Sequence, residues 1–87
     1  MDQEKADHPH QAEELDEGRR IRRLQLMMNL VMQVIAQDTK LTFEEAQQMV
    51  ADSRIAALAM FPGKELAYYL IYQPRFQRLM QERFRLR

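Results

Sequence analysis

The sequence predicts an all-α protein: a small helical bundle of three main helices, a short C-terminal helix after Pro74, and a disordered acidic N-terminal tail. Three observations support this fold class. Apolar residues recur at helical spacing over residues 21–35, a capping-box sequence begins at Thr42, and no segment carries the Asn-Gly or Asp-Gly turn of a β-hairpin. The 87 residues suffice for one domain. We expect residues 15–87 to form it and residues 1–14 to form the tail.

Charge is distributed unevenly along the chain. Residues 1–17 carry seven acidic side chains and one lysine, whereas residues 18–87 carry twelve basic and six acidic side chains. The tail has too few apolar groups to stabilise a fold, which predicts disorder. It lacks the basic and apolar regions of a secretory signal, and no uncharged run reaches the ~20 residues that span a bilayer as a helix. Together with the absence of cysteine, this predicts a cytoplasmic protein without a membrane span.

The first helix contains fourteen consecutive residues without a formal charge, from Leu24 to Gln37. We expect this helix to begin near residues 14–18, with Asp16 as its N-cap, and to end at Gln37. The alternating three- and four-residue spacing of its apolar side chains is typical of a coiled-coil seam. The seam consists of Ile21, Leu24, Met28, Val31 and Ile35.

A helix without charge on any face is normally covered on most of its sides. A chain of this length has few other residues with which to cover the first helix. We therefore expect a second copy or a partner protein to pack against this helix. On this interpretation Val31→Asp dissociates or unfolds the protein. The predicted interaction face consists of Leu24, Met27, Met28, Val31, Met32 and Ile35.

The second helix has the best-defined boundaries. Thr42 and Glu45 have the spacing of a capping box, in which each side chain binds the other residue's backbone N–H. Pro62 and Gly63 end the helix near residue 61. From Ile55 onward the helix is apolar on all sides, so we expect this end to be the most buried part of the molecule.

The third helix begins near residues 63–65 and meets Pro74, which leaves two alternatives. A new helix begins with Pro74 in its first turn, where proline is favoured, or a single helix continues through the proline with a kink. If the helix continues without a break, Leu66, Tyr69 and Leu70 share a face with Phe76. We expect that face to pack in the core.

Nothing in the sequence indicates catalysis. The chain has no cysteine, its single serine, Ser53, lies in a predicted helix, and both histidines, His8 and His10, lie in the tail. Gly18 and Gly63 are the only glycines, so there is no glycine-rich phosphate loop. The tail histidines lack the preorganised ligand set that a metal site needs. We therefore predict no enzymatic activity, no cofactor and no metal.

Arginines form two clusters along the sequence, and tyrosines at positions 68, 69 and 72 lie between them. Basic side chains beside aromatic rings are typical of contacts with phosphates and bases. The residues expected to bind anions are Arg19, Arg20, Arg22, Arg23, Arg75, Arg78, Arg83 and Arg85.

Two functions follow from these patterns. The first is a non-enzymatic helical interaction module, which homodimerises or binds a partner protein through an apolar helix face. The alternative is a small nucleic-acid-binding or regulatory protein that uses both arginine clusters, with the acidic tail as a competitor. Salt separates the two, because apolar contacts persist at high salt, whereas arginine–phosphate contacts weaken steeply.

Overall fold

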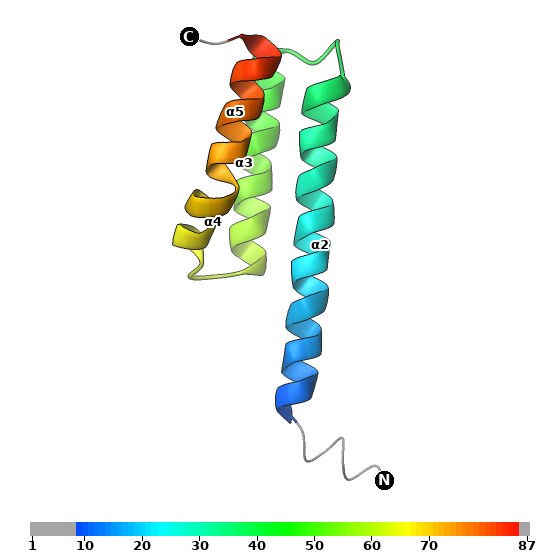
Figure 1. Cartoon of the computed structure of the whole chain (residues 1–87), viewed down its shortest axis with the longest axis vertical. Helices are drawn as coiled ribbons and strands as arrows, with labels where there is room; N and C mark the ends of the chain where they lie inside the picture. The colour runs from blue at the N-terminus through cyan, green and yellow to red at the C-terminus, as the bar shows by residue number, and fades with distance from the viewer. Residues whose placement is uncertain (1–8, 86–87) are drawn as a thin grey trace.

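The computed structural model describes residues 9–85, and this part of the chain is helical without any strand. Its elements are α2 (Pro9–Gln37), α3 (Phe43–Met60), α4 (Glu65–Ile71) and α5 (Gln73–Phe84). Only Tyr72 separates α4 from α5, so these two segments are the limbs of one bent helix (Figure 1). The described residues thus form three helices, the last of them bent, and the all-α prediction is confirmed.

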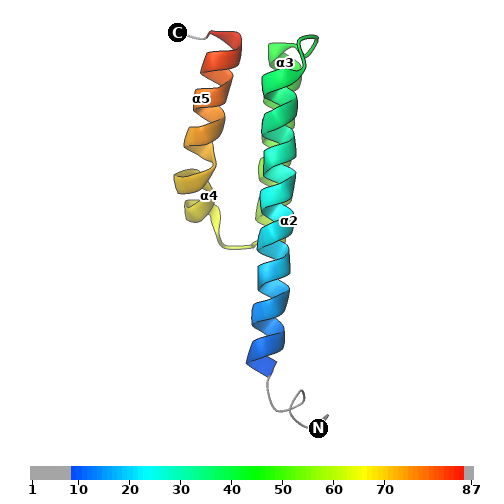
Figure 2. The ribbon, with the colours of Figure 1, turned by 45° about the vertical axis from the view of Figure 1, so that its right-hand side comes forward.

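The three helices lie side by side. α3 runs antiparallel to α2, and α5 returns in the direction of α2 (Figure 1). α2 contacts both α3 and α5, while α3 also contacts both limbs of the bent helix. Seen after a turn of 45°, α2 lies in front of α3, with α4 and α5 to one side (Figure 2). The N-terminal turns of α2 extend past the α3–α4 turn and have no neighbouring helix there.

α2 begins earlier than predicted. Its first helical residue is Pro9 rather than a residue between 14 and 18, and Asp16 lies inside the helix instead of capping it. Proline suits the first turn of a helix because its missing N–H has no intrahelical partner there. Gly18 costs about 1 kcal/mol in a helix interior but does not interrupt this one. The predicted tail boundary at residue 14 therefore falls within α2, and residues 1–8 lie outside the described residues.

The core forms where the three helices meet. Four of the five residues of the predicted α2 seam point into it: Met28 and Ile35 are fully buried and Leu24 and Val31 partly buried against them, whereas Ile21 is 42% exposed. α3 contributes the small side chains of Ala46, Ser53 and Ala57, and the bent helix contributes larger ones. The latter are Tyr68, Tyr72, Phe76 and Met80.

The ends of α3 follow the sequence closely. The Thr42 hydroxyl accepts a hydrogen bond from the Glu45 backbone N–H at 3.1 Å, and the Glu45 carboxylate accepts one from the Thr42 N–H at 2.9 Å. Gly63 takes a left-handed conformation, φ 79°, in the turn after the helix. The expectation that the Ile55 end is the most buried is wrong, because Ile55 is 62% exposed. Ala59, one turn further along, is exposed as well.

The bent helix resolves the two alternatives at Pro74. The Tyr72 N–H donates to the Tyr68 carbonyl at 2.9 Å, and the Phe76 N–H donates to the Tyr72 carbonyl at 2.9 Å. Helical hydrogen bonds therefore flank the bend. Pro74 itself has no N–H, and its ring pushes away the carbonyl of Leu70. The segment after the bend is not the short one that was predicted, since α5 has 12 residues and α4 has 7.

One row of side chains faces inward along both limbs of the bent helix. Tyr68 and Tyr72 are buried, while Leu66 and Leu70 point to the outside at 72% and 69% exposure. The prediction that Leu66 and Leu70 share the core face of Phe76 is therefore wrong. The buried side chains Tyr68, Tyr72, Phe76 and Met80 instead follow one another at four-residue spacing, which keeps successive members on one side of a helix.

Candidate functional site

The predicted interaction face of α2 lies inside the chain's own fold. Met28 and Ile35 are fully buried, and the other four members are partly buried against the core: Leu24, Met27, Val31 and Met32. α3 and α5 supply the cover that was expected from a second molecule. On its outer side α2 still presents an exposed stripe at four-residue spacing, made of Leu26, Leu30 and Val34.

α4 carries the most exposed large apolar side chains of the described residues. After Glu65, its first residue, α4 carries no charged residue, and its remaining side chains are apolar or aromatic on every side. Tyr68 and Tyr72 pack inward, while Leu66, Leu70 and Ile71 remain exposed. A helix that is apolar on all sides is normally covered on all sides, and the described chain covers α4 on one side only.

The sequence contained a signal for this surface that the sequence analysis did not use. The charge-free run of α4 is the same kind of signal that drew attention to α2, but it is shorter and follows a turn. We assigned Leu66 and Leu70 to the core, so their side of the helix was not considered as a surface.

An apolar groove borders the inner edge of α4. It has a volume of about 350 Å³ and lies between the N-terminal half of α2, the end of α3 and α4. Its apolar wall includes Ile21, Leu58, Phe61 and Ile71. Because Ile71 lines the groove and is itself exposed, the groove continues into the exposed surface of α4. We refer to Leu66, Leu70, Ile71 and this groove as the α4 surface.

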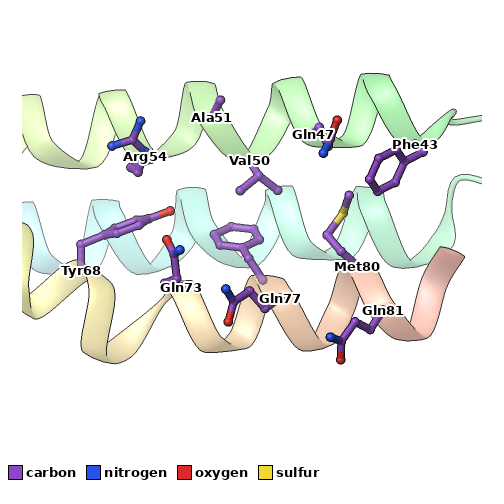
Figure 3. A pocket seen from close by; sticks show the side chains of 11 residues that line it. Phe43, Gln47, Val50, Ala51, Arg54, Tyr68, Gln73, Gln77, Met80 and Gln81 are labelled. Carbon is purple, nitrogen blue, oxygen red and sulfur yellow. The ribbon is translucent and has the colours of Figure 1, made fainter. Parts of the chain in front are cut away.

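A second groove runs between α3 and α5 on another side of the molecule, with a volume of about 510 Å³. Its apolar residues include Val50, Phe76 and Met80, and four glutamines line it as well. Figure 3 shows Arg54, Tyr68 and Gln73 at one end of this groove and Phe43 at the other. The glutamines are Gln47, Gln73, Gln77 and Gln81.

The Tyr68 hydroxyl is the one buried side-chain polar atom of the described residues without a hydrogen-bond partner. Burial raises the pKa of Tyr68, the positive charge of Arg54 lowers it in part, and Tyr69 raises it further. Burial is the largest of these effects, so the phenol keeps its proton and remains a hydrogen-bond donor at neutral pH.

The structure separates the predicted anion-binding arginines. The four arginines at positions 19, 20, 22 and 23 are exposed on the N-terminal half of α2. Arg75 and Arg78 line a groove of about 400 Å³ between α2 and α5, and Arg85 is exposed at the end of α5. Arg83 donates to the carbonyls of Ile35 and Asp38 at 3.1 and 2.8 Å. Its guanidinium is thus engaged at the C-terminal end of α2, about 18 Å along that helix from Arg23.

The described residues hold no group of three or more histidine, cysteine, aspartate or glutamate side chains placed to bind a metal. The Ser53 hydroxyl donates to the Val50 carbonyl at 2.8 Å, a local bond of the kind that serines commonly form in helices. Among these residues, too, no helix combines the length and apolar character needed to cross a membrane. No protein-family model, no curated protein and no solved structure matches the chain.

Proposed function

We propose that this protein is a non-enzymatic helical interaction module that binds a second copy of itself or a partner protein through the α4 surface. One observation carries the proposal: after Glu65, α4 carries only apolar and aromatic side chains, and the described chain covers it on one side only. Contiguous exposed apolar surface of this kind is typical of protein–protein contacts.

The energetics favour burial of this surface. Covering a leucine or isoleucine side chain completely is worth about 1.5–3 kcal/mol, and Leu66 and Leu70 are still more than two-thirds exposed. The adjoining groove, with Ile21 and Phe61 in its wall, offers a concave site for apolar side chains. A second helix can cover the exposed leucines of α4 while its own apolar side chains enter the adjoining groove. The product of such a contact is a small helical bundle.

The test is the double variant Leu66→Glu/Leu70→Glu, measured by size-exclusion chromatography with light scattering at low and high salt. We expect the unaltered protein to have the mass of two chains, or of a complex with its partner, and to keep that mass at high salt because apolar contacts persist there. The double variant should have the mass of one chain with unchanged helical circular dichroism.

Ile55→Glu is the matched control, because Ile55 is comparably exposed but lies on the outer side of α3. This variant should associate like the unaltered protein. If Ile55→Glu and the double variant have the same effect, or neither has any, association does not depend on the α4 surface and the proposal fails.

Nucleic-acid binding is the alternative function. The observation that favours it is the exposure of the four α2 arginines, of which only Arg19 has a carboxylate within 4.0 Å among the described residues, that of Asp16. Binding by these arginines would weaken steeply as salt rises. A titration with duplex and single-stranded DNA at two salt concentrations distinguishes it from association through α4, which salt does not weaken.

A further inference from the structure

The groove between α3 and α5 has a cationic end and a long apolar floor. Arg54, Tyr68 and Gln73 lie at one end (Figure 3), and Val50, Phe76 and Met80 line the stretch beyond them. Along α3 the groove extends from Arg54 to Phe43, about 16 Å at the rise of an α-helix. Arg54 is the only charged residue in its lining.

Two polar groups at the cationic end lack suitable partners. Tyr68 is only 5% exposed, and its hydroxyl forms no hydrogen bond in the described chain. Arg54 is half-buried, has no carboxylate of the described residues within 4.0 Å, and forms a single long hydrogen bond of 3.4 Å to the Tyr69 hydroxyl. Buried hydroxyls and partly buried guanidinium groups normally have partners. Both groups are donors: the phenol has no acceptor in the described chain, and the guanidinium has only the distant oxygen of Tyr69.

We propose that this groove binds an amphipathic monocarboxylate. The carboxylate accepts hydrogen bonds from the Arg54 guanidinium, the Tyr68 hydroxyl and the Gln73 side-chain amide. The apolar chain of the ligand lies along Val50, Phe76 and Met80. Tyr68 also lines the groove of the α4 surface, but Arg54, Gln73 and the apolar floor do not, so this proposal does not depend on the proposed function.

The chemistry of the lining selects this ligand class. A guanidinium binds a planar carboxylate through two parallel hydrogen bonds, and a single positive charge matches a single negative one. A cationic amphiphile would find no acidic partner in the groove. Gln77 and Gln81 line the groove with amides and add no charge.

Entry of the carboxylate requires a small rearrangement. The Tyr68 hydroxyl oxygen is buried in the described structure, and the side chain best able to move is that of Arg54. Its only hydrogen bond is long, and arginine has several rotatable bonds. We therefore expect the Arg54 guanidinium to change rotamer and to expose the phenol to the ligand.

The experiment is a calorimetric titration of the full-length protein with decanoate, below its micellar concentration, and with decyltrimethylammonium as the matched cation. We expect decanoate to bind and the ammonium compound not to bind. Arg54→Gln and Tyr68→Phe should each weaken decanoate binding at least about tenfold, since each removes a hydrogen bond to a charged group. Arg78→Gln, which removes the same charge from the α2–α5 groove, should leave decanoate binding unchanged.

Tyr68→Phe also separates binding from folding. Because the hydroxyl has no partner in the described chain, its removal should leave the melting temperature of the unliganded protein unchanged or raised. The melting temperature should then rise with decanoate in the unaltered protein and much less in the variant. Absence of decanoate binding, equal binding of both amphiphiles, or full affinity in Arg54→Gln would each overturn the proposal.

Discussion

The guanidinium of Arg83 joins the last turn of α5 to the C-terminal end of α2. It donates to the carbonyls of Ile35 and Asp38, which belong to the last turn of α2 and the residue after it, where helix carbonyls lack intrahelical partners. A positive charge is also favourable at that end of a helix. The ring of Phe84 lies 4.8 Å from the same guanidinium and helps to fix its position.

Arg83→Met keeps an apolar stem and removes the donors, so we expect a loss of about 1–3 kcal/mol in the free energy of unfolding. Urea denaturation followed by circular dichroism measures this loss. Arg78→Met is the control, since Arg78 carries the same charge on the same helix and its side chain is exposed. Equal effects of the two substitutions would show that charge, rather than the carbonyl contacts, accounts for the loss.

The role of Arg83 could not be predicted from the sequence. Arg83 and Asp38 are 45 positions apart, and only the packing of α5 beside α2 brings them together. Composition alone placed Arg83 in an anion-binding cluster. Tyr68 and Arg54 could not be related from the sequence either, since only the packing of α4 against α3 brings them together.

α3 shows how much a local pattern can predict for one helix. All the atoms of its capping box belong to four consecutive residues, so the predicted N-terminus was confirmed. Thr42→Ala should lower the free energy of unfolding by about 1 kcal/mol. Glu44→Ala, one residue from the same cap and outside it, should have a smaller effect, and urea denaturation of both variants makes the comparison. A Thr42→Ala variant as stable as the unaltered protein would mean that the cap contributes nothing.

The bent helix shows the opposite case. Pro74 indicated an interruption of the helix. The direction of the bend, however, depends on how α4 packs against α3, which is a tertiary contact. Two apolar rows compete in this segment, Leu66 with Leu70 and Tyr68 with Tyr72, and the row of tyrosines is the buried one. The buried row keeps its four-residue spacing through Pro74 to Phe76 and Met80, so spacing allowed this face, and only the packing on α2 and α3 selects it over the leucines.

At the scale of the whole molecule, the sequence predicted that the apolar seam of α2 is covered. It did not predict which helices cover it. The seam itself was confirmed at Met28 and Ile35. Whether the cover comes from the same chain or from a second one depends on the topology, which composition does not encode. In the structure α3 and α5 of the same chain cover the seam. The apolar surface that remains uncovered lies on α4.

Two neighbouring valines of α2 test this assignment. Val31 is partly buried against the core, so Val31→Asp places a charge where it has no partner, and such a charge is strongly destabilising. Val34 is three residues further along and 40% exposed, so the aspartate of Val34→Asp can reach water. We expect Val31→Asp to lose helical circular dichroism at 25 °C, because a chain of this size has only a few kcal/mol of stability to lose.

Val34→Asp should remain folded and should associate as the unaltered protein does, since its side chain lies apart from the α4 surface. The measurement is a thermal melt of both variants, combined with light scattering on whichever remains folded. A Val31→Asp variant that stays helical but has the mass of one chain would show that the interface lies on the α2 seam and not on the α4 surface. It would also mean that α3 and α5 do not cover that seam in solution, because a buried aspartate at position 31 could not be tolerated between them.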